Sequence, residues 1–133
     1  MYKDDIMVFS KAKYGKDPVS DNFKVREFAC KDGSDVVFVS EELVDVLQDV
    51  RNFFGKAVVI NSAYRTVQHN AAVDGSKNSY HCYGMAADIV VRGVPAANVY
   101  KYLDEKYPNK YGIGKYSGFT HIDVRSTKAR WKG

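Results

Sequence analysis

The stretch SYHCYGMAAD, residues 79–88, carries the strongest functional signal in the chain. It places an imidazole, His81, seven residues before a carboxylate, Asp88, with a glycine between them and apolar residues around the aspartate. A second segment, FTHID at residues 119–123, supplies another imidazole, His121. Two histidines and one carboxylate are a suitable ligand set for catalytic zinc, which keeps its fourth position for water. Together the two segments predict a hydrolytic metal site.

Strand geometry supports this grouping. Side chains alternate along a strand, so His121 and Asp123 should project from the same face. Asp88 lies within an apolar strand-like run, where a solitary carboxylate is costly to bury without a partner such as a metal ion. Gly84 would let the chain turn so that His81 folds back towards Asp88.

Each of the three residues also has a purely structural interpretation. Asp88 could cap a turn, His81 could be a surface loop residue, and His121 could be a histidine satisfied within the core. The spacing of one histidine and one aspartate does not by itself exclude these alternatives.

Composition restricts the class of protein. A chain of 133 residues with 45% hydrophobic and 27% charged residues fits one ordinary soluble domain. No apolar run is long enough to span a bilayer, and residues 1–20 show no secretory signal. Cys30 and Cys82 form no disulfide framework, so reduced thiols are expected, with a pairing left open. The net charge of +4 favours anionic surfaces, but the basic residues are scattered, which argues against nucleic acid.

The pattern of apolar and turn residues predicts an α+β fold, with a small antiparallel sheet flanked by helices. Residues 1–21 are expected to form a loosely attached leader, and residues 22–133 the functional domain. A helix should begin after Ser40 and end at Gly55. The remaining elements are predicted as strands at 57–60 and 86–91, helices at 66–73 and from Pro95 to about Tyr107, and a hairpin of 111–116 with 119–124.

The ordered motifs resemble those of the zinc D-Ala-D-Ala carboxypeptidase family. That family includes phage L-alanyl-D-glutamate endopeptidases and shares its fold with hedgehog signalling domains. The resemblance covers about residues 22 to 131 and implies a small bacterial or prophage member. The segments that carry it are SYHCYGMAAD (79–88), NSAYRT (61–66, with Ala63 for the usual glycine), His69-Asn70 with Gly75, FTHIDVR (119–125) with ARW (129–131), and FKVREF (23–28).

The resemblance implies a role for each matching residue. His81, Asp88 and His121 correspond to the zinc ligands, and Arg65 to the arginine that engages the substrate carboxylate or the developing oxyanion. A guanidinium suits either task because it is permanently charged and presents a planar fork to oxygen pairs. Ser79 could bind substrate or orient His81, although a serine before a turn often bonds only backbone.

The identity of the general base is left open. Several relatives place an acidic residue three positions before the last histidine ligand, where this chain has Gly118. Asp123 is the nearest obvious carboxylate. It could accept a proton from the water that zinc activates, or it could instead orient His121.

Three functions are compatible with these residues. The leading hypothesis is a monomeric zinc peptidase that cuts peptidoglycan stem peptides, as a D,D-carboxypeptidase or an L-Ala-D-Glu-type endopeptidase. It would act as a phage endolysin released from the cytoplasm to the cell wall, or as a module of a secreted wall hydrolase. A catalytically degenerate, zinc-containing domain that only binds wall peptide is the alternative, and a basic nucleic-acid-binding domain is the third.

Overall fold

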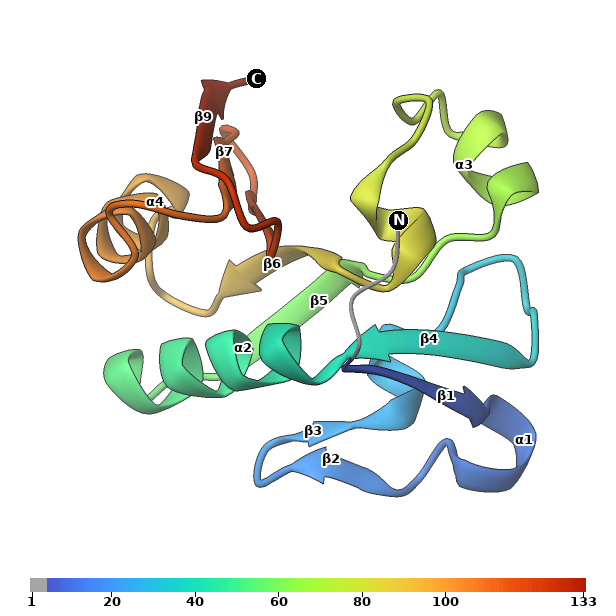
Figure 1. The fold of residues 1–133 in the computed structure, drawn as a ribbon. Helices are drawn as coiled ribbons and strands as arrows, with labels where there is room; N and C mark the ends of the chain where they lie inside the picture. Colours follow the sequence, from blue (N-terminus) through green and yellow to red (C-terminus); the bar gives the residue numbers. More distant parts are fainter. Residues whose placement is uncertain (1–4) are drawn as a thin grey trace.

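A five-stranded sheet forms the centre of the C-terminal half of the protein (Figure 1). The computed structural model describes residues 5–133. The strand order is β5-β6-β8-β7-β9, and all neighbours are antiparallel except β7 and β9, which run parallel. The strands are β5 (Val58–Ser62), β6 (Ala86–Val91), β7 (Gly112–Lys115), β8 (Thr120–Asp123) and β9 (Ala129–Lys132). The predicted α+β class is confirmed, and the parallel edge strand β9 is an addition that the sequence analysis did not predict.

The register of the sheet brings the two predicted functional segments together. In the β6–β8 pair, Asp88 lies directly opposite His121, and Ala86 lies opposite Asp123. Residues directly opposite each other on antiparallel strands carry their side chains on the same face, close enough to interact. The predicted hairpin of β7 and β8 is confirmed, with Gly114 opposite His121.

The helix α2 (Glu41–Phe54) has the boundaries that its sequence predicts. The Ser40 hydroxyl accepts a hydrogen bond from the Leu43 N–H, and Gly55 ends the helix in the left-handed region at φ 62°. Its buried face enters the core through Leu43, Val44, Val46, Leu47 and Val50. Phe53 is also apolar, but it is 60% exposed and its ring stacks on Tyr102 at a centroid distance of 3.9 Å.

Two further helices and a 3₁₀ turn surround the central sheet. The helix α4 (Ala96–Lys106) follows Pro95, which stands just before the first helical residue and not within the first turn. The helix α3 (Val67–Ala72) is capped by Thr66, whose hydroxyl accepts from the His69 N–H. The segment before β6, expected to be a loop, forms the 3₁₀ helix η2 (Tyr80–Tyr83).

The N-terminal segment is more firmly attached than its composition suggests. Strand β1 (Ile6–Ser10) pairs antiparallel with β4 (Val36–Ser40), and α1 (Lys11–Tyr14) follows it. The chain then forms β2 (Pro18–Ser20), β3 (Phe23–Lys24) and the 3₁₀ helix η1 (Val25–Phe28). The expected loose leader therefore contains a paired strand, while its residues 1–4 lie outside the described residues and the boundary at residue 21 stays a prediction.

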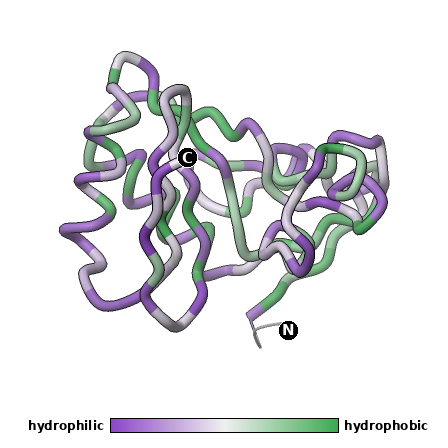
Figure 2. The backbone as a smooth tube through the Cα atoms, turned by 90° about the horizontal axis from the view of Figure 1, so that it is seen from above, coloured by the Kyte–Doolittle hydropathy of each residue, from purple (hydrophilic) through white to green (hydrophobic). Residues whose placement is uncertain are grey.

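Hydropathy along the backbone matches elements that are buried on one side. Hydrophobic and hydrophilic residues alternate over short distances along most of the chain (Figure 2). Within residues 5–133, no helix has the length and apolar character needed to cross a membrane. Both cysteines are free thiols: Cys30 is buried and Cys82 is half-buried.

Candidate metal centre and substrate pocket

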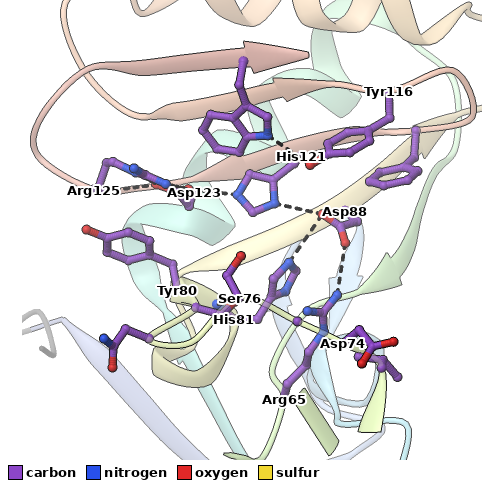
Figure 3. Close-up of a pocket in the computed structure, with 16 residues that line it drawn as sticks. Arg65, Asp74, Ser76, Tyr80, His81, Asp88, Tyr116, His121, Asp123 and Arg125 are labelled. Carbon is purple, nitrogen blue, oxygen red and sulfur yellow. Dashed lines mark hydrogen bonds and ion pairs between the residues drawn. The ribbon is translucent and has the colours of Figure 1, made fainter. Parts of the chain in front are cut away.

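Three predicted ligands converge at the centre of one pocket (Figure 3). His81 comes from η2, Asp88 from β6 and His121 from β8. Asp88 Oδ1 lies 3.4 Å from His81 Nε2 and 2.9 Å from His121 Nδ1. One ligand atom from each of the three residues lies within 4.8 Å of the others. Pairing of β6 with β8 and the turn after η2 thus assemble a cluster from residues that are far apart in sequence.

His81 is held in one orientation by the backbone. Its side chain is almost fully buried, and Nδ1–H donates to the Ala63 carbonyl at 2.7 Å, which leaves Nε2 directed at Asp88. Gly84 ends η2 at φ 72°, and a side chain there would collide with the backbone of Phe38. The predicted turn at Gly84 is therefore confirmed, and it requires glycine for two separate reasons.

His121 is held from both sides by carboxylates. Nδ1 contacts Asp88 at 2.9 Å, and Nε2 contacts Asp123 Oδ2 at 2.8 Å. Asp123 is fully buried, and it also accepts hydrogen bonds from Arg125 Nε at 2.7 Å and Arg125 Nη2 at 2.8 Å. The predicted shared face of His121 and Asp123 is confirmed. Asp123 lies on the side of the imidazole that faces away from Asp88.

The electrostatics of the cluster keep both carboxylates ionised at neutral pH. Burial would raise the pKa of Asp88, but hydrogen bonds to His121 and His81 outweigh burial and hold that pKa well below its usual range. Burial likewise opposes ionisation of Asp123, but Arg125 and His121 lower its pKa. Burial lowers the pKa of His121, and the hydrogen bonds to Asp123 and Asp88 outweigh it, so the net pKa is raised.

The donor set and its spacing fit zinc. In a tetrahedral site with bonds of about 2.0–2.1 Å, neighbouring ligand atoms are separated by about 3.3 Å. The separations of 3.4 Å and 2.9 Å from Asp88 Oδ1 are close to that value. Each histidine also uses its second ring nitrogen to contact a carbonyl or a carboxylate, the usual arrangement around metal-bound imidazoles. The residues that would hold the ion are His81, Asp88 and His121.

Arg65 extends into the same pocket from the segment between β5 and α3. Its Nε donates to Ser62 Oγ at 3.0 Å, Nη1 donates to Asn70 Oδ1 at 3.1 Å, and Nη2 lies 3.4 Å from Asp88 Oδ2. Asn70 is buried and donates in turn to the Ser76 carbonyl at 3.0 Å. Three directional contacts therefore fix the guanidinium at the edge of the cluster, and Asn70 is a support that the motif alone did not assign.

Ser79 also lies at the pocket, where it caps η2. Its hydroxyl oxygen accepts a hydrogen bond from the His81 backbone N–H at 3.2 Å. This contact is the backbone hydrogen bond that a serine before a turn often makes, and a role for Ser79 in binding substrate stays a prediction. Gly118, where relatives have an acidic residue, adjoins open space. Among the described residues, the carboxylates that line the pocket are Asp74, Asp88 and Asp123.

Aromatic side chains form one wall of the pocket, whose volume is about 420 Å³. The Trp131 ring lies 5.1 Å from the His121 ring, and its Nε1–H donates to Tyr116 Oη at 3.0 Å. Trp131 lies over Gly114, where any side chain would collide with the indole. Tyr116 in turn stacks on Phe119 at 4.4 Å. This wall could not be predicted, because the ARW segment carries no signal that β9 would pair with β7.

One comparison relates this sequence to a known protein family. The family model described as Peptidase M15 matches residues 19–123, which is most of the chain. No curated protein matches the sequence. The matched region includes all three residues of the cluster and Arg65. The chain therefore belongs to the peptidase M15 family, whose members are zinc metallopeptidases.

Proposed function

We propose that the protein is a zinc-dependent peptidase that hydrolyses peptide bonds in peptidoglycan stem peptides. The reaction is that of a D,D-carboxypeptidase or an L-Ala-D-Glu-type endopeptidase. One observation carries the proposal: the cluster of His81, Asp88 and His121 and the guanidinium of Arg65 line the same pocket. Stem peptides are short and rich in carboxylates, and the pocket offers a hydrolytic centre beside a fixed cation.

The cluster and Arg65 have separate roles in the proposed reaction. His81, Asp88 and His121 would hold a zinc ion, and the ion would supply a Lewis acid for the scissile carbonyl and lower the pKa of a water molecule. Arg65 anchors a carboxylate of the substrate through the donors that Ser62, Asn70 and Asp88 leave unused. The anchor fixes the scissile bond relative to the cluster, which lowers the entropic cost of reaching the transition state.

We assign Asp123 the role of orienting His121, the second of its two predicted roles. Both of its oxygens are already engaged, Oδ2 by His121 and Arg125 and Oδ1 by Arg125. It is also fully buried and faces the side of His121 opposite Asp88. A carboxylate with these contacts stabilises the imidazole ligand and fixes its tautomer.

The proposed activity is tested with purified muropeptides. The zinc-loaded protein is incubated with intact sacculi and with soluble stem peptides, and the products are identified by mass spectrometry. We expect one new peptide terminus, whose position identifies the cleaved bond, and no such product from a His121→Ala protein. Absence of cleavage by the fully zinc-loaded wild type on every substrate would favour the binding alternative, which the glycine at position 118 supports.

Arg65→Lys is expected to impair hydrolysis while zinc content and folding stay near those of the wild type. Lysine keeps the charge but loses the planar fork that reaches Ser62, Asn70 and a substrate carboxylate together. The measurements are kcat/KM on the cognate peptide, zinc content and thermal unfolding. Arg92→Lys, at an exposed position outside the pocket, is the matched control. An unchanged kcat/KM for Arg65→Lys would remove this residue from the mechanism.

A further inference from the structure

We propose that Arg125 forms a second carboxylate-binding subsite, so that the substrate carries acidic groups on both sides of the cleaved bond. The inference rests on the proposed peptidase function and extends it to the substrate class. It concerns the end of the pocket away from Arg65, where the sequence motifs assign no residue to substrate. Arg125 and Arg65 both line the pocket that surrounds the metal cluster.

The two arginines terminate one continuous chain of polar contacts (Figure 3). Arg125 contacts Asp123, Asp123 contacts His121, His121 contacts Asp88, and Asp88 contacts Arg65. The separations along this chain are 2.8, 2.8, 2.9 and 3.4 Å in that order. The metal cluster lies within this chain of contacts, and the two guanidinium groups lie at its ends. A peptide bond positioned at the cluster therefore lies between Arg65 and Arg125.

Arg125 is held rigidly without using all of its donors. Asp123 takes Nε–H and one Nη2–H, and within residues 5–133 no hydrogen bond from Nη1 is recorded. A guanidinium has five N–H donors, so three remain for a ligand. The side chain is 23% exposed, compared with 0% for Asp123 beneath it. Solvent and ligands can therefore reach the side chain, and its unused N–H groups are the donors that Asp123 leaves for a ligand.

Aromatic rings fix the plane of this guanidinium. Its central carbon lies 4.5 Å from the centroid of Tyr80 and 5.3 Å from that of Trp131. Stacking of this kind restrains a long side chain before any ligand binds, so little rotamer entropy is lost on binding. The two rings also replace water beside part of the cation, which strengthens a charged hydrogen bond at its edge.

A carboxylate is the ligand chemistry that this arrangement favours. The exposed edge offers parallel N–H donors, which match the two oxygens of a carboxylate, and it offers no acceptor to a cationic or amide group. Asp123 balances the charge of Arg125 but does not cover the remaining donors. A carboxamide in the same place would present one N–H group towards another and lose the ionic part of the contact.

The test converts the carboxylates of a short stem peptide to carboxamides one at a time. We expect two different carboxylates to matter, each amidation weakening the interaction about tenfold, the usual scale for losing one charged hydrogen bond. The loss caused by amidating a given carboxylate is its amidation penalty. One of the two penalties should disappear in Arg65→Lys and the other in Arg125→Gln. For each protein variant, kcat/KM for the unmodified peptide is divided by kcat/KM for the amidated peptide, both measured at saturating zinc. A general loss of activity in a variant cancels in this ratio.

Binding provides an independent measurement if no peptide is cleaved. Trp131 is the only tryptophan of the chain and lies against Arg125, so its fluorescence should respond when a peptide occupies this subsite. The same amidated peptides are titrated against the zinc-loaded protein. Absence of cleavage with a preserved Arg125-dependent preference would overturn the peptidase proposal and leave the subsite standing.

Two variants control for the buried carboxylate beneath Arg125. Arg125→Lys keeps a positive charge near Asp123 and should retain the fold while losing most of the carboxylate preference. Arg92→Gln removes one exposed positive charge outside the pocket and should leave both penalties intact. The subsite is refuted if a single carboxylate accounts for the whole effect, or if both penalties persist unchanged in Arg125→Gln and Arg125→Lys.

Discussion

An Asp88→Asn protein is expected to lose bound zinc and all measurable hydrolysis. Asp88 is the only carboxylate of the predicted ligand set, and both histidines contact its Oδ1 atom. Asparagine keeps the shape but offers a neutral amide oxygen, a weak zinc ligand. The loss of zinc affinity should exceed the roughly 10- to 100-fold that outer partners of metal ligands typically contribute.

Zinc content by elemental analysis and competition with a chelator measures this effect. His81→Ala and His121→Ala should reduce zinc in the same way, because an open site has only three protein ligands. Asp21→Asn, at an exposed position outside the pocket, serves as the control. Normal zinc content in all three ligand variants would refute the metal site, and normal content in one of them would identify a wrongly assigned ligand.

Asp123→Asn is the second substitution with a large expected effect. If Asp123 orients His121, zinc affinity should fall by roughly 10- to 100-fold, and added zinc should restore part of the activity. If it acts as the general base, zinc should stay bound while turnover falls by a factor on the order of 100 to 10,000. We expect the first result, because the carboxylate is fully buried and engaged by His121 and Arg125.

Turnover measured across a zinc titration distinguishes the two outcomes. Asp104→Asn is a suitable control, because Asp104 also accepts a hydrogen bond from an arginine, Arg130, at 2.6 Å but lies outside the pocket. A loss of turnover that zinc does not rescue, with zinc affinity unchanged, would return Asp123 to the role of base.

Local signals predicted the part of the fold that carries the cluster. The apolar run of β6, the turn at Gly84 and the alternation in β8 are all properties of short segments, and each was confirmed. The cap at Ser40 fixed the start of α2 in the same way. Family resemblance then identified which polar residues should meet, and the register of β6 with β8 brings two of them face to face.

Contacts between distant segments could not be predicted. The pairing of β1 with β4 joins residues separated by about thirty positions, and neither sequence indicates which strand it will pair with. The packing of Trp131 over Gly114 depends in the same way on the parallel return of β9 to β7. The role of Asp123 was left between two alternatives because the strand pattern gives its face but not which ring nitrogen it contacts.

The position of β9 has a consequence for how this protein could diversify. The family match ends at residue 123, whereas Arg125 and Trp131, which form one end of the pocket, lie beyond it. Mutations at Arg125 or in β9 are therefore expected to change substrate preference without altering the metal ligands. The contact between Gly114 and Trp131 limits such mutations. Any larger residue at position 114 would collide with the indole, so it requires a smaller residue at position 131. Evolution of specificity here should leave paired substitutions at these two sites.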